Sequence, residues 1–108
     1  MDQETTYILV LVTTSSTKEA EAIGRPLIEA RLAACVNIFS GVRSLFRWQG
    51  AIEDQEEALL LVKSRSDLLP SIIETVKRLH SYTVPEVIAL PILAGSPDYL
   101  AWIDESVG

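Results

Sequence analysis

Apolar and polar residues follow their clearest pattern between residues 35 and 63, and this pattern predicts one long β-hairpin. The first half alternates with a period of two, as expected of a half-buried strand. We expect one face of this arm to carry Val36, Ile38, Val42, Phe46 and Trp48. The second half ends in the apolar run 59–62, which has no polar face and therefore predicts a strand buried on both sides. Gly50 lies between the arms, where a tight turn needs a positive φ.

The predicted hairpin is long for a chain of 108 residues. Arms of about fourteen residues at about 3.4 Å per residue span more than 40 Å. A domain of this length has a radius of gyration of about 13 Å, so the hairpin should project beyond its own core. Phe46 and Trp48 near its tip would then need another surface to bury them. We infer that a second copy of the chain provides it.

The chain before the hairpin predicts a strand and a helix. Residues 7–12 form a short apolar run typical of a central strand. Ser16 and Glu19 match a capping box, which predicts a helix from this point to about Ala33. Pro26 lies inside that helix, where it removes a hydrogen bond, so we expect a kink rather than two helices.

After the hairpin, Ser66 or Asp67 is expected to cap a second helix, and residues 87–93 are expected to form a fourth strand. Ser96 followed by Pro97 predicts the start of a short last helix. The order β-α-β-β-α-β followed by a helix is ferredoxin-like, an α+β fold with two helices on one face of an antiparallel sheet. We expect a single domain over residues 1–108, with a loose tail at residues 1–6.

Charge and composition narrow the classes of function. The net charge of -6 and the isoelectric point of about 4.6 argue against binding to nucleic acid or to an anionic membrane surface. The single cysteine excludes a disulfide within the chain and fits a reducing, cytoplasmic compartment. No signal peptide or membrane-spanning segment is recognisable in the sequence.

Several separated segments resemble the divalent-cation-tolerance (CutA) family. They are residues 32–37, Trp48 with Gly50, Glu57 ahead of Lys63, His80 with Tyr82, residues 84–86, and residues 99–103. The resemblance extends from about residue 7 to residue 107. It implies a ferredoxin-like subunit in a tight homotrimer, a role in copper or other divalent-metal tolerance, and weak binding of divalent cations. The implied architecture is also similar to PII-type signal proteins, which hold small ligands in clefts between subunits.

The resemblance is incomplete at the positions of a copper site. Members described as copper binders have a thiol at the end of the first strand and a pair of histidines. The matching residues here are Val12, Leu79 and His80, so only His80 retains a metal ligand. His80 and Cys35 are the candidate metal ligands. The alternatives are a histidine that complements a helix C-terminus and a cysteine that packs as a small apolar residue.

A second candidate site is a cleft between subunits. Its predicted members are Trp48, Glu57, Lys63, Tyr82 and Glu86. The acidic members suit a cation or an ammonium group, and the aromatic members suit a small organic ligand. For each of them the alternative is an ordinary surface or packing role. The sequence shows no paired nucleophile and base, so we expect a binding protein rather than an enzyme.

Overall fold

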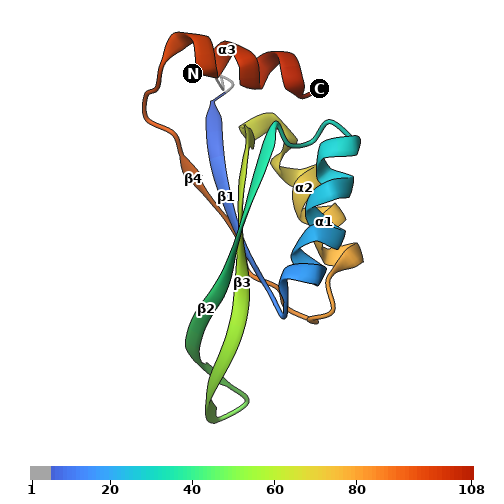
Figure 1. Cartoon of the computed structure of the whole chain (residues 1–108), viewed down its shortest axis with the longest axis vertical. Coiled ribbons are helices and arrows are strands. Elements are labelled where there is room, and N and C mark those ends of the chain that lie inside the picture. Colours follow the sequence, from blue (N-terminus) through green and yellow to red (C-terminus); the bar gives the residue numbers. More distant parts are fainter. Residues whose placement is uncertain (1–5) are drawn as a thin grey trace.

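The structure is a computed structural model that describes residues 6–108 (Figure 1). Its elements are β1 (Tyr7–Thr14), α1 (Thr17–Glu29), β2 (Cys35–Trp48), β3 (Ala51–Arg65), the 3-10 turn η1 (Ser66–Leu68), α2 (Leu69–Leu79), β4 (Val87–Pro91) and α3 (Pro97–Ser106). The strands form one sheet in the order β2-β3-β1-β4, and every neighbouring pair is antiparallel. This is the predicted α+β, ferredoxin-like arrangement. The predicted loose tail falls mainly on residues 1–5, which lie outside the described residues, whereas Thr6 exchanges hydrogen bonds with Ser66.

The hydrophobic core lies between one face of the sheet and the helices α1 and α2 (Figure 1). Alternate residues of β1 and β3 point into it, as the period of two requires. The largest core side chains are Val10, Val12, Ile23, Leu27, Leu60, Val62, Ile72 and Val76. The helices cover only this face, so the other face of the same strands is left open.

The hairpin of β2 and β3 is as long as the sequence predicted, with strands of 14 and 15 residues. Gln49 and Gly50 form a two-residue turn, and both have positive φ, at 50° and 84°. This is the backbone that joins two strands without splaying them. In Figure 1 the hairpin extends well beyond the ends of the helices.

The predicted faces of the first arm are wrong beyond residue 39. The pairing register shifts by one residue between Phe39 and Val42, where Gly41 has a φ of 71°. Such a bulge places an extra residue in one strand and exchanges the faces of all residues after it. Val36 and Ile38 therefore face the helices, while the later apolar residues Val42, Phe46 and Trp48 lie on the other face of the hairpin.

The end of α1 and the start of α2 differ from the sequence prediction. α1 ends at Glu29 rather than near residue 33, because Arg31 adopts a left-handed conformation with a φ of 59°. The Leu32 N–H donates to the Leu27 carbonyl, which completes a Schellman-type end. α2 begins after a 3-10 turn and has no side-chain cap, so Ser66 and Asp67 do not cap it. α1 is one helix, as predicted, with Pro26 inside it, and the kink stays a prediction.

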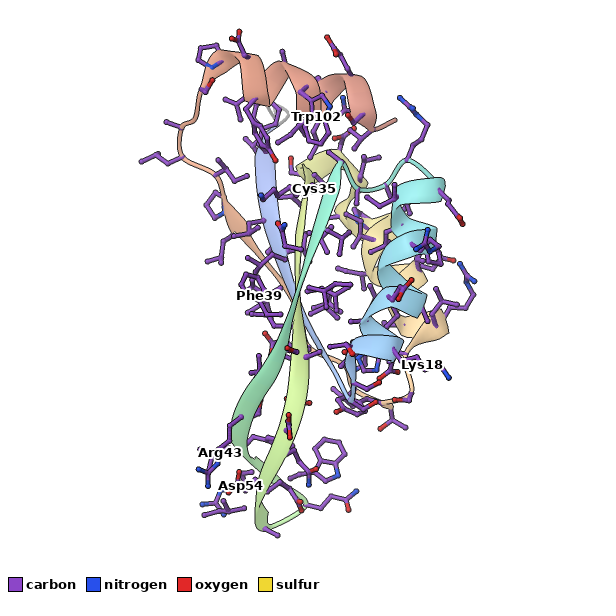
Figure 2. The ribbon with its side chains drawn as sticks, in the orientation of Figure 1. Lys18, Cys35, Phe39, Arg43, Asp54 and Trp102 are labelled. Atoms are coloured by element: carbon purple, nitrogen blue, oxygen red, sulfur yellow. The ribbon has the colours of Figure 1, made fainter. Side chains whose placement is uncertain are left out.

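α3 lies across the end of the sheet that is far from the hairpin tip (Figure 1). Two sets of hydrogen bonds hold it there. The Arg31 guanidinium donates to the carbonyls of Glu105 and Gly108, and the Tyr7 hydroxyl donates to the Asp104 carboxylate at 2.6 Å. These contacts fix the position of α3, and Figure 2 shows its Trp102 at the same end of the molecule as Cys35.

The open face of the sheet is apolar. Phe39 is 47% exposed and points away from the helices (Figure 2), and Ile88 and Leu90 of the edge strand are about as exposed. Leu59 and Leu61 of β3 lie on the same face and are half-buried. Within a single chain, the apolar run 59–62 is thus covered on its core side and left partly open on the other side.

Candidate ligand-binding groove

A groove of about 900 Å³ runs between the hairpin and the loop that follows α2. The hairpin supplies one wall because the bulge has turned Phe46 and Trp48 towards it, along with alternate residues of β3. The end of β1 and the loop 81–86 supply the other. The lining residues are Thr13, Ser15, Ser44, Leu45, Phe46, Trp48, Glu53, Gln55, Glu57, Ser81, Tyr82, Thr83, Val84 and Glu86.

A hydrogen bond between Tyr82 and Glu57 crosses the groove. The Tyr82 hydroxyl donates to Oε2 of Glu57 at 2.7 Å. Burial and the neighbouring Glu57 carboxylate raise the pKa of Tyr82 to about 12. The phenol therefore keeps its proton and remains a donor at every physiological pH. Glu57 itself is only 6% exposed, which is unusual for an acidic side chain.

His80 fastens the start of the loop, and both of its ring nitrogens are engaged. Nε2 lies 2.7 Å from the Thr13 carbonyl, and Nδ1 lies 3.0 Å from the backbone N of Tyr82. A carbonyl only accepts and a backbone N–H only donates, so the proton resides on Nε2. The ring is fully buried and holds the end of β1 against the loop. This geometry explains why the sequence places a histidine, rather than a further lysine, at the end of α2.

Glu19, in the first turn of α1, also holds the start of the loop 81–86. Its carboxylate accepts hydrogen bonds from the backbone N–H groups of Ser15 and Ser81 and from the Ser15 hydroxyl. Burial acts to raise the pKa of Glu19, but the hydrogen bonds from Ser15 and Ser81 outweigh it and lower the pKa to about 2. Ser16 caps α1 as predicted, whereas the Glu19 carboxylate joins the groove loop to α1 instead of closing the capping box.

The groove is acidic and aromatic. Glu53, Glu57 and Glu86 line it, and none of its lining residues is a lysine or an arginine. Phe46 and Trp48 are both partly exposed at its hairpin wall. Since the whole chain carries a net charge of -6, the groove favours a positively charged occupant.

The structure brings together four of the five residues that the sequence assigned to the cleft. Trp48, Glu57, Tyr82 and Glu86 all line the groove. Lys63 does not, because it lies six residues beyond Glu57 on β3, about 20 Å away along the strand. Its ammonium group is 5.7 Å from the centre of the Tyr99 ring at the α3 end of the molecule.

The two candidate metal ligands lie apart. His80 bonds Thr13, near one end of β1, whereas Cys35 pairs with Lys63, which in turn pairs with Leu9. Thr13 and Leu9 are separated by about 14 Å along the strand. Within residues 6–108 no three side chains of His, Cys, Asp or Glu are close enough to hold a metal ion. Metal binding by either residue stays a prediction.

Sequence reasoning missed how Glu19 and Phe46 contribute to the groove. Glu19 was recognised only as a helix cap, and its bond to Ser81 joins residues 62 positions apart. Phe46 was assigned to the same face of the hairpin as Val36 and Ile38, because the bulge was not recognised. The Ser40-Gly41 pair was the available signal for it, since a glycine within a strand often marks a bulge.

Comparison with known proteins agrees with this fold. The profile of the family described as CutA1 divalent ion tolerance protein matches residues 8–106. The chain belongs to this family. The divalent-cation tolerance protein CutA of Thermus thermophilus is 49% identical over 100 residues, which cover 93% of this chain and 97% of that protein. The predicted family resemblance is therefore confirmed.

Two further relatives show how the CutA family varies. The protein CutA of Mus musculus is 44% identical over 87% of this chain, and the match spans 53% of the mouse protein. A solved structure from Archaeoglobus fulgidus, described as a periplasmic divalent cation tolerance protein CutA, superposes with a TM-score of 0.92 at 43% identity. That match covers 94% of this chain and 99% of the other. No helix within residues 6–108 has the length and apolar character needed to cross a membrane.

Proposed function

We propose that this CutA-family chain forms a cytoplasmic homotrimer that takes part in the response to copper or another divalent metal and binds such ions weakly. The open apolar face of the sheet supports the oligomer. Phe39 on β2 and Ile88 and Leu90 on β4 lie at the two edges of this face, each about half exposed, and the half-buried Leu59 and Leu61 of β3 lie between them. A contiguous apolar patch of this kind on a monomer usually marks an interface. Three copies arranged around an axis would bury it, together with the partly exposed face of the run 59–62.

The acidic groove is the observation that carries the metal-binding part of the proposal. Glu53, Glu57 and Glu86 attract a divalent cation, but they do not converge as a set of direct ligands. A hydrated ion held by one or two carboxylates fits this arrangement. His80 would have to give up one of its two hydrogen bonds to bind a metal, at a cost of about 1 kcal/mol. Both features predict weak binding.

The protein acts in this proposal by binding rather than by catalysis. His80 is the only histidine of the chain, and both of its nitrogens are already engaged. The Cys35 thiol contacts the Asn37 side chain at 3.6 Å, far from that histidine. No nucleophile in the described part of the chain is therefore paired with an imidazole base.

Calorimetric titration with copper(II) and zinc(II) tests the metal-binding part. The wild type should bind weakly, Glu57→Gln should bind more weakly still, and Glu105→Gln should match the wild type. His80→Ala and Cys35→Ser show whether either candidate ligand contributes. Absence of any heat of binding at millimolar metal would contradict the proposal. Light scattering tests the oligomer separately, with an expected mass three times the 11.9 kDa of one chain.

A second candidate function is a signal or binding module of the PII kind, which holds a small ligand in this groove at the boundary between subunits. The size of the groove and its aromatic wall favour it. About 900 Å³ lined by Phe46, Trp48 and Tyr82 is in the range of small-molecule sites. In a trimer, Lys63 of a neighbouring copy could reach the site that Lys63 of the same copy does not. A thermal-shift screen of metabolites tests this function. If no compound in the screen stabilised the protein, that result would count against the function.

A further inference from the structure

Glu57 is a buried acidic side chain without a cationic partner. It is 6% exposed, and its Oε2 accepts one hydrogen bond, from Tyr82. Neither a salt bridge nor a second hydrogen bond to this carboxylate is formed by the other residues in the range 6–108. A carboxylate offers about four acceptor positions, and buried charges are normally paired. Glu57 lines the groove, so its unused oxygen is open to an occupant from outside the chain.

The surroundings of Glu57 select the chemistry of that occupant. Trp48, Phe46 and Tyr82 line the same groove, and the faces of aromatic rings attract organic cations. Glu53 and Glu86 add negative charge, while the lining contains no competing lysine or arginine. A desolvated carboxylate beside aromatic rings suits a cation that carries both N–H donors and apolar surface.

We propose that the groove binds the primary ammonium group of a small organic cation. Its N–H groups donate to the free oxygen of Glu57, and its alkyl part lies against Trp48 and Phe46. This inference rests on the small-ligand function proposed above and names the class of its ligand. A metal ion satisfies the same charge less well, because three protein ligands do not converge within the described residues. A quaternary ammonium ion has the charge but no N–H to donate.

A nitrogen-15 NMR titration tests the inference on the full chain at constant ionic strength. The probe is n-butylammonium chloride, and tetramethylammonium chloride is the comparison with the same charge. The reporter is the Trp48 indole N–H signal, which Trp102→Phe identifies. We expect a saturable shift with n-butylammonium and binding about tenfold weaker with tetramethylammonium, since a hydrogen bond to a charged group is lost.

Matched variants separate the role of Glu57 from a general effect of charge. Glu57→Gln should weaken n-butylammonium binding about tenfold or more, whereas Glu105→Gln, with the same change of charge on α3, should not alter it. Tyr82→Phe keeps the Glu57 charge and frees its second oxygen, so binding should persist. This variant also keeps the test decisive if Glu57→Gln fails to fold.

Three results would overturn the inference. One is a shift that rises linearly without saturation, and another is equal binding by the wild type and Glu57→Gln. The third is binding that appears only in Lys63→Met, which would show that Lys63 of a second copy already occupies the groove. If one of these results is obtained while zinc still binds, this inference falls and the metal-binding proposal stands.

Discussion

The Tyr82 hydroxyl donates a 2.7 Å hydrogen bond to the Glu57 carboxylate, joining the loop after α2 to the middle of β3. The two residues are 25 positions apart in the sequence. Glu57 is held by the sheet register opposite Val42, just beyond the bulge, and Tyr82 is held by the hydrogen bond from its N–H to His80. The bond thus fixes the separation of the two walls of the groove.

Replacing Tyr82 with phenylalanine should destabilise the protein. Tyr82→Phe leaves the buried Glu57 carboxylate without its donor, at a cost of about 1–3 kcal/mol. Urea unfolding at a fixed protein concentration measures this change, because oligomers unfold in a concentration-dependent manner. Tyr99→Phe is the control, since the Tyr99 hydroxyl makes no hydrogen bond with the described residues. Equal midpoints for the two variants would contradict the expectation.

The same bond should make stability depend on alkaline pH. The pKa of Tyr82 is raised from 10.0 in the unfolded chain to about 12 in the fold. The stability it contributes is complete below pH 10 and is lost as the pH rises towards 12. We expect the wild type to lose more stability than Tyr82→Phe over this range. Ultraviolet titration of the phenols should show a late transition that the variant lacks, besides that of Tyr7, whose pKa is raised by its hydrogen bond to Asp104.

Glu19 should give stability an acid dependence of the opposite sign. Its pKa falls from 4.5 in the unfolded chain to about 2 in the fold. The contribution is therefore complete above pH 4.5 and is lost as the pH falls towards 2. Glu19→Gln should be less stable at pH 7 by about 1–3 kcal/mol and should lose less stability on acidification. Glu21→Gln, a change at an exposed residue of the same helix, is the control. If the stability of Glu19→Gln fell on acidification as much as that of the wild type, the result would contradict this account.

His80 is expected to carry its proton on Nε2. Nitrogen-15 NMR of the imidazole at pH 8 should show this tautomer, because the Thr13 carbonyl only accepts and the Tyr82 N–H only donates. His80→Ala should destabilise the chain by about 1–3 kcal/mol through the two unsatisfied backbone groups, whereas the exposed change Lys77→Ala should have little effect. A proton observed on Nδ1 would exclude the proposed hydrogen-bond pattern.

A charge on the open face of the sheet should disrupt the proposed trimer. Phe39→Glu would place a carboxylate on this apolar face beside Leu59, the residue that pairs with Phe39 on β3, where an interface would desolvate it without a partner. Light scattering should then report the mass of a single chain. Ile28→Glu is a matched control, because Ile28 is 40% exposed but lies on α1, away from this face. Retention of the wild-type mass by Phe39→Glu would mean that this face is not the interface.

The elements of the fold were predictable because their signals are local. The capping residue Ser16, the alternation in the hairpin and the turn at Gly50 depend on neighbouring residues alone. Boundaries were less predictable. α1 stops early because Arg31 adopts a left-handed backbone, and its carbonyl accepts from Gly108 while its side chain reaches the end of α3, contacts that no local pattern reveals.

The sequence by itself determined the ferredoxin-like order of elements, the long hairpin and the resemblance to the divalent-cation-tolerance family, since each depends on residue types at fixed spacing. Only the tertiary structure decided which residues share a site. The bulge at Gly41 turned Phe46 and Trp48 towards the groove, and the sheet register separated Lys63 and Cys35 from it. The physical reason is that a one-residue register shift reverses the direction of every later side chain, while distance along a strand grows by about 3.4 Å per residue. The buried charge of Glu57 follows from the same register, because its exposure is set by segments that lie far from it in the chain.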